Sequence, residues 1–212
     1  MRNTKALELL QAGRIEELKT LLRDEIYADN LKTKPGAKKR YAAMKKYFTY
    51  HTSVREVLQH PCDIDFEGET YISFCNSWSL ALTREDCGEI VKLDDPSRYP
   101  DVTRLIRFDG VKKKIDFNKL FAEARSKGYK FTKSEVGPGF TYVLSYDGGY
   151  FKIGLIEATF GIINDGEPAI TYHPDGGYTP LTIKNNLGLC MIMPVKFDDS
   201  PEDCNKIIIE VN

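Results

Sequence analysis

The chain has 212 residues, of which 42% are hydrophobic and 29% are charged, and its formal net charge is −1. This composition is typical of a globular protein with a sizeable buried core, and the near-zero charge excludes an overall electrostatic attraction to nucleic acid or to an acidic membrane. No apolar run approaches the roughly 20 residues that a membrane-spanning helix requires. The N-terminus lacks the apolar core of a secretory signal, so we expect a cytoplasmic protein without a membrane partner.

The N-terminal part of the sequence has a helical pattern. A short helix is predicted from Thr4 to Leu10 and stops at Gly13. A longer helix follows from Ile15 to Ile26, where apolar residues recur at helical spacing. A third helical stretch follows Pro35-Gly36. We assign residues 1–48 to a helical segment, which either forms a hairpin or caps the rest of the chain.

A basic cluster lies within this segment, because no acidic residue occurs between Asn30 and Arg55. It carries a local charge of +7, from Lys32, Lys34, Lys38, Lys39, Arg40, Lys45 and Lys46. Together with nearby aromatic residues, such a cluster can contact phosphates and stack on bases, which makes DNA a candidate partner. The alternative is a solvated helix face that balances the acidic helix before it.

From residue 49 the pattern becomes mixed. Ser53 is expected to cap a short helix from Val54 to Gln59. Three strands are then predicted, at 63–66, 70–75 and 79–83. A polar, proline-marked connector at 92–101 ends this part, so we assign residues 49–98 to one partial half-domain and residues 99–212 to a second domain.

The second domain repeats a pattern of elements. A strand at 114–117 leads to a helix that Asn118 caps, and further strands are predicted at Phe131 and at 140–145. A hairpin turn at Asp147-Gly148-Gly149 follows. Downstream, the sequence predicts a strand at 150–153, a helix at 155–163, strands at 168–172, 179–183 and 189–193, and a last strand at 207–211. The order strand–helix–strand–strand–strand thus begins near Lys114 and again near Tyr150. We predict an α+β fold with repeated β-α-β-β-β half-domains and mainly antiparallel sheets.

Several of these segments resemble the bacterial DNA polymerase III β subunit, the sliding clamp. The resemblance lies in the linker Tyr99-Pro-Asp-Val-Thr-Arg-Leu-Ile106, in the segment from Asp147 to Ala158, and in the closing strand Ile192-Met-Pro-Val-Lys-Phe197. It implies a DNA-clamp-like fold over about residues 53–197. The chain departs from the family in having one and a half such domains rather than three, an N-terminal helical segment, and an acidic extension after Phe197.

The resemblance implies two kinds of site. In the family, the closing strand lines a groove for short peptides of replication proteins, and the matching residues here are Met193, Pro194 and Val195. The alternative is that these residues pack in the core.

Basic residues on the helices that face the ring's hole contact DNA in the family. The corresponding residues here are Lys119, Arg125 and Lys127, in addition to Lys38, Lys39, Arg40, Lys45 and Lys46 of the basic cluster.

No enzymatic motif is present in the sequence. The three histidines are far apart and the five cysteines form no Cys-x-x-Cys pair, so no metal or cofactor is expected and the thiols are expected to be free. His173, beside Pro174, is expected to be a surface turn residue.

We therefore predict a non-enzymatic clamp-like binding protein that holds DNA or a replication-associated peptide, and that can form a homo-oligomer. The alternatives are an interaction module of a mobile genetic element that has lost the clamp role, and a small hydrolase or transferase with a site assembled from loops.

Overall fold

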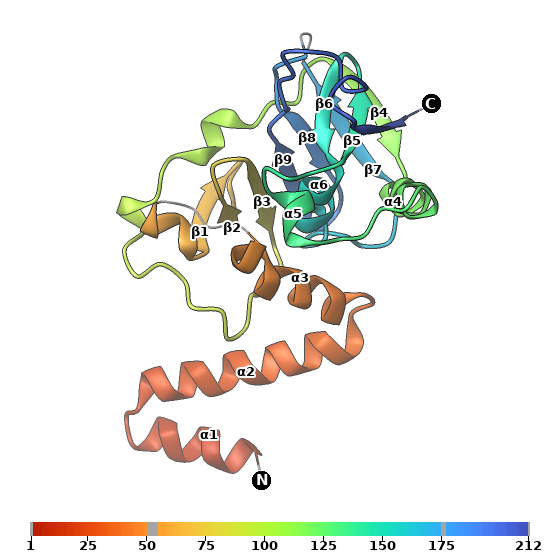
Figure 1. Ribbon diagram of the computed structural model, residues 1–212. Coiled ribbons are helices and arrows are strands. Elements are labelled where there is room, and N and C mark those ends of the chain that lie inside the picture. Colours follow the sequence, from red (N-terminus) through yellow and green to blue (C-terminus); the bar gives the residue numbers. More distant parts are fainter. Residues whose placement is uncertain (1, 51–54, 175–176, 212) are drawn as a thin grey trace.

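The computed structural model describes residues 2–50, 55–174 and 177–211 (Figure 1). The helices are α1 (Arg2–Gln11), α2 (Ile15–Thr33), α3 (Ala37–Tyr50), α4 (Phe117–Ser126), α5 (Lys133–Val136) and α6 (Ile153–Phe160). Three short 3-10 helices are η1 (Glu56–Gln59), η2 (Pro96–Arg98) and η3 (Val102–Leu105). The expected capping residue Ser53 lies outside the described residues. Within the described part of the chain, no helix is long and apolar enough to span a bilayer.

The strands form two sheets. They are β1 (Cys62–Phe66), β2 (Glu69–Cys75), β3 (Ser79–Thr83), β4 (Val111–Ile115), β5 (Tyr142–Tyr146), β6 (Gly149–Lys152), β7 (Ala169–His173), β8 (Leu181–Lys184), β9 (Gly188–Ile192) and β10 (Ile207–Glu210). The large sheet has seven strands in the order β1-β2-β3-β9-β8-β7-β4, and all its pairs are antiparallel. The small sheet has the order β10-β5-β6, with β10 parallel to β5. The prediction of an α+β fold with mainly antiparallel sheets is therefore confirmed.

The hairpins follow from turn residues that tolerate a left-handed backbone. In the β1–β2 turn, Glu67 and Gly68 have φ values of 53° and 80°. In the β5–β6 turn, Asp147 and Gly148 have φ values of 46° and 75°. Two consecutive positive φ angles match the right-handed twist of the flanking strands. The turn predicted at 147–149 is confirmed.

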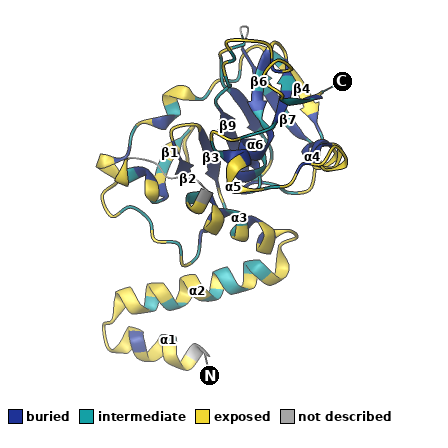
Figure 2. Ribbon diagram, in the orientation of Figure 1, coloured by how far each residue is buried: buried dark blue, intermediate teal, exposed yellow. Residues whose placement is uncertain are grey.

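Helix α6 lies at the centre of the molecule. It packs on β3 and β9 of the large sheet, on β5 and β6 of the small sheet, and on α3. Seven of its eight residues are buried, which agrees with a sequence that is apolar nearly all round (Figure 2). Phe160 illustrates the packing, because its ring centroid lies 4.8 Å from that of Phe117 on α4. Helix α6 therefore holds the two sheets and two helices in one core.

The opposite face of the large sheet is covered by the segment between β3 and β4. Side chains alternate along a strand, so Leu80 and Leu82 point away from α6 and pack with Val102 of η3. Tyr99 is buried in the same cluster, and its hydroxyl lies 3.0 Å from the Ser73 hydroxyl. The segment predicted as a polar connector at 92–101 thus contributes a buried aromatic residue to the second layer of the core.

Three finer predictions differ from the structure. Asp116, not Asn118, caps α4, because its carboxylate accepts the Lys119 N–H at 3.1 Å. No strand forms at Phe131, where the chain leads into α5. The repeated half-domains are not confirmed either, because β5 and β6 form the small sheet whereas β7, β8 and β9 lie in the large one.

Candidate ligand-binding groove

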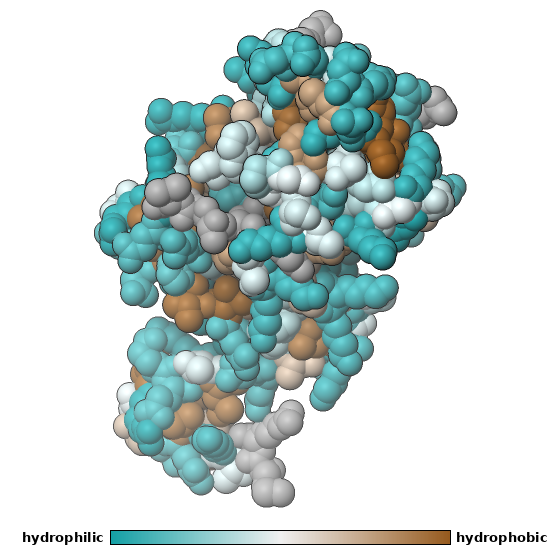
Figure 3. Space-filling view, viewed as in Figure 1, coloured by the Kyte–Doolittle hydropathy of each residue, from teal (hydrophilic) through white to brown (hydrophobic). Residues whose placement is uncertain are grey.

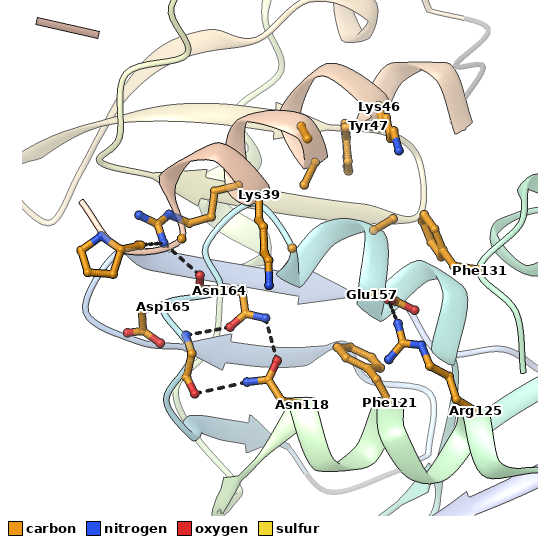
Figure 4. A pocket seen from close by; sticks show the side chains of 18 residues that line it. Lys39, Lys46, Tyr47, Asn118, Phe121, Arg125, Phe131, Glu157, Asn164 and Asp165 are labelled. Carbon is orange, nitrogen blue, oxygen red and sulfur yellow. Dashed lines mark hydrogen bonds and ion pairs between the residues drawn. The ribbon is translucent and has the colours of Figure 1, made fainter. Parts of the chain in front are cut away.

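A groove of about 610 Å³ lies between α3, α4 and the C-terminal half of α6 (Figure 4). This volume lies within the range of small-molecule and cofactor sites. The described residues that line the groove are Pro35, Gly36, Lys39, Arg40, Ala42, Ala43, Lys46, Tyr47, Asn118, Phe121, Arg125, Phe131, Glu157, Ala158, Gly161, Asn164, Asp165 and Gly166. Small residues therefore form much of the floor, and longer side chains from three parts of the chain stand around it.

The packing of α3 decides which of its lysines face the groove. Met44 and Tyr47 are buried in the core, and Ala43, which lies one residue before Met44, lines the groove. Lys39 and Lys46 are four residues before and three residues after Ala43, so all three lie on one helical stripe. Figure 4 shows the Lys39 side chain extended into the groove. Both lysines are exposed, and neither has an ion pair among the described residues.

A second pair of lysines on α3 faces elsewhere. Lys38 and Lys45 are exposed and do not line the groove. The Lys45 ammonium lies 4.6 Å from the centroid of the Tyr41 ring and 3.7 Å from the Glu89 carboxylate. Part of the Lys45 charge is therefore already neutralised within the fold.

The opposite wall combines aromatic and basic side chains from α4. Phe121 and Arg125 are one helical turn apart, and the Arg125 guanidinium lies 6.0 Å from the Phe121 ring centroid. Arg125 also forms an ion pair with Glu157 of α6 (Figure 4). Phe131, from the loop after α4, adds a partly buried ring. Because Phe121 is only 4% exposed, the accessible aromatic surface of this wall comes from Phe131, beside the ion-paired Arg125.

A closed hydrogen-bond network fixes one end of the groove. The Asn164 side-chain amide donates to Asn118 Oδ1 at 3.0 Å, and the Asn118 amide donates to the Gly166 carbonyl at 3.2 Å. The Gly166 N–H in turn donates to Asn164 Oδ1 at 2.9 Å. These bonds join the start of α4 to the turn after α6, so they fix the position of α4 relative to that turn.

Arg40 is buried, and its side chain stabilises the fold instead of facing solvent. Its side chain is only 3% exposed and forms a bidentate ion pair with Glu85, with N–O distances of 2.6 and 2.7 Å. Its remaining nitrogen donates to the carbonyls of Pro35 at 2.9 Å and Asn164 at 3.1 Å. Because every part of the guanidinium is engaged, Arg40 anchors α3 to two loops and is not available to contact an external phosphate.

The remaining predicted site residues lie outside the groove. Lys119 is exposed on α4 and lies 3.9 Å from Asp116, and Lys127 is exposed directly after α4 and lies 3.2 Å from Glu123. Exposed pairs of this kind contribute little stability and reduce the local positive field. Of the eight predicted basic residues, the groove thus brings Lys39, Lys46 and Arg125 together from two parts of the chain, with the buried Arg40 beneath them.

The predicted peptide-binding residues follow β9 as an extended segment. The Met193 N–H donates to the Trp78 carbonyl at 2.9 Å, and the Val195 N–H donates to the Tyr150 carbonyl at 2.8 Å. Met193, Pro194 and Val195 are all half-buried. The backbone N–H groups of Met193 and Val195 are therefore already used within the protein and are not available to a peptide.

The groove also contains aromatic and polar residues that the sequence did not identify. The sequence pattern predicts a strand at Phe131 and gives no indication of a binding site at Asn164. Asn164 stands directly before the turn at Asp165-Gly166, and an asparagine before such a turn often bonds to nearby backbone. That signal favours a turn, but it does not indicate a binding site.

His173 and Cys75 are both buried. The prediction that His173 is a surface turn residue is wrong, because its side chain is fully buried, with Nδ1 3.3 Å from Asp147 and Nε2 3.2 Å from the Thr179 hydroxyl. Burial raises the pKa of Cys75 to about 12, so its thiol is protonated at neutral pH and is not a nucleophile. Among residues 2–50, 55–174 and 177–211, no group of three His, Cys, Asp or Glu could hold a metal ion.

Comparison with known proteins gives no relative for this chain. No protein-family profile, no curated protein and no solved structure matches it. The function must therefore be argued from the groove and its residues.

Proposed function

We propose that this protein is a non-enzymatic binding protein that holds a single-stranded nucleic-acid segment in the groove between α3, α4 and α6. The observation that carries the proposal is that Lys39, Lys46 and the partly buried ring of Phe131 line one groove, together with Phe121, which is 4% exposed. Proteins that bind single strands without sequence preference combine a positively charged groove with aromatic rings on which bases stack.

The charges of the groove support an anionic ligand. Lys39 and Lys46 have no carboxylate partner among the described residues, whereas Arg125 is paired with Glu157. Asp165 is the other acidic residue of the lining. The two ammonium groups without a carboxylate partner would neutralise phosphates, and Arg125, which is half-exposed, can contact a phosphate while it keeps its ion pair with Glu157.

Removing both free lysines tests the proposal. We expect the variant with Lys39→Ala and Lys46→Ala to bind a dye-labelled oligodeoxythymidine at least about tenfold more weakly than the wild type, which corresponds to about 1.4 kcal/mol. Fluorescence anisotropy at low salt measures this. Both lysines are exposed, so the fold should be retained and its circular dichroism unchanged.

Lys114 provides the matched control, because it is equally exposed but lies on β4, away from the groove. Lys114→Ala should bind the oligonucleotide as the wild type does. Equal losses in the Lys114 variant and in the Lys39/Lys46 variant would show that binding is a diffuse charge effect, and no binding by the wild type at low salt would contradict the proposal outright.

The clamp-like function is a separate proposal that rests on the sequence resemblance. It requires several copies to surround duplex DNA, and it predicts that the protein stays on a circular duplex but slides off a linear one. Its peptide-binding part assigns a replication-associated peptide to Met193, Pro194 and Val195, and it predicts that Met193→Ala weakens capture of such a peptide. Equal retention on circular and linear DNA would contradict encirclement.

A further inference from the structure

Helices α1 and α2 form a hairpin that projects from the rest of the protein (Figure 1). All 19 residues of α2 are described, and none of them is buried. The hairpin meets the body mainly through α3, where the rings of Tyr27 and Tyr41 lie 4.6 Å apart. Because isolated helices are marginal without tertiary packing, an additional partner would stabilise this hairpin.

The hairpin exposes large apolar side chains. They are Leu7 and Leu10 in α1, at 53% and 54% exposure, and Ile15, Leu22 and Ile26 in α2, at 44%, 43% and 60%. They are five of the nine exposed large hydrophobic residues of the described chain. Figure 3 shows hydrophobic side chains gathered over α1 and α2. Such a concentration on one small element is typical of an interaction surface.

These side chains lie on one face of the hairpin. Leu10 follows the buried Leu9 by one residue, and Leu22 follows the half-buried Leu21 by one residue, so each is rotated by about 100° from its inward-facing neighbour. Helices α1 and α2 are antiparallel, since only a short turn around Gly13 joins them. Equal rotations in antiparallel helices bring both side chains out on the same side of the pair.

This apolar face is directed away from the body. Leu31 and Tyr27 of α2 line a small cavity together with Met44 of α3. Leu31 is nine residues after Leu22, which is two and a half turns of the helix, so the two side chains point in opposite directions from the axis of α2. Leu22 therefore points away from Leu31, and both Leu22 and Ile26 remain exposed, at 43% and 60%.

We infer that this face binds the same face of a second copy of the chain. The spacing of α2 is self-complementary about Leu22, because Leu18 and Ile26 lie four residues on either side of it. A two-fold axis at Leu22 sets Leu22 against its own counterpart and Leu18 of one copy against Ile26 of the other. Two hairpins joined in this way make a four-helix bundle whose centre is apolar.

The size of the face fits a modest dimer. Helix α2 is about 28 Å long, α1 about 15 Å, and each is about 10 Å wide, which gives roughly 430 Å² per copy in flat projection. Convex side chains raise the accessible area, so that two copies approach the ~1,000 Å² that specific interfaces reach. We therefore expect a dimer that dissociates on dilution.

Light scattering over a concentration series tests the dimer. The wild-type mass should rise from 24.1 kDa toward twice that value, whereas the variant with Leu22→Lys and Ile26→Lys should stay at 24.1 kDa. Leu105→Lys, at an equally exposed position on η3, should behave as the wild type. A wild type that stays at 24.1 kDa throughout, or a dimer that survives both lysine substitutions, overturns the inference.

A cross-link tests the position of the axis. In a background of Cys204→Ser, which removes the exposed thiol, Leu22→Cys should form a reducible dimer upon oxidation. The other four cysteines are buried, so they should not contribute. Leu105→Cys in the same background should remain monomeric under the same oxidation. A dimer in light scattering without a cross-link at position 22 contradicts the two-fold arrangement.

Discussion

Replacing Arg40 by alanine is expected to lower the free energy of unfolding by about 3–5 kcal/mol, which is the cost of breaking a buried ion pair by removing one partner. The loss arises because Glu85, whose side chain is 11% exposed, would keep a buried charge with no partner. The carbonyls of Pro35 and Asn164 would also lose their donor. Urea unfolding followed by circular dichroism measures the change.

Two further variants identify the cause of that loss. Lys39→Ala, one residue earlier on the exposed side of α3, should change the stability by less than about 0.5 kcal/mol. Combining Arg40→Met with Glu85→Leu should recover most of the lost stability, because an apolar pair of similar volume leaves no buried charge. A loss below about 1 kcal/mol for Arg40→Ala would mean that the ion pair does not anchor α3.

Replacing Phe160 by alanine is expected to cost about 3–5 kcal/mol of stability. The side chain is fully buried at the end of α6 and packs against Phe117, so its removal leaves a cavity at the point where α6 meets α4. The measurement is again urea unfolding, with the slope of the transition as a check that unfolding remains two-state.

Phe131→Ala is the matched control for the core, because this ring is only partly buried and lines the groove. We expect it to cost clearly less stability than Phe160→Ala and to weaken oligonucleotide binding instead. Equal effects of the two substitutions on stability would contradict the assignment of Phe131 to the groove wall rather than to the core.

Most strands and helices were predictable because they depend on local signals. Strands with alternating apolar residues are bounded by turn residues such as Asp147 and Gly148, and α6 is apolar on all sides. The sheet order was not predictable, because it depends on pairs that are distant in sequence. Leu80, for example, pairs with Met191, and Ile207 of β10 pairs in parallel with Tyr142. Local patterns carry no information on such pairings.

The site was predictable in part. The basic cluster was visible, but adjacent residues in its α3 part have opposite roles. Arg40 is four residues before Met44 and seven before Tyr47, so the helical period could have placed it on the buried stripe. Lys39 and Lys46 share the next stripe. What the sequence could not supply is the partner of Arg40, because Glu85 is 45 residues away.

The salt dependence of oligonucleotide binding tests the central claim most directly. If Lys39, Lys46 and Arg125 each neutralise one phosphate of a single strand, the logarithm of the affinity should fall with the logarithm of salt concentration with a slope of about −2, at roughly −0.7 per phosphate. The variant with Lys39→Ala and Lys46→Ala should reduce that slope to about one third of its value. A slope near zero in the wild type, or a slope that is unchanged in the variant, would contradict a nucleic-acid site in the groove.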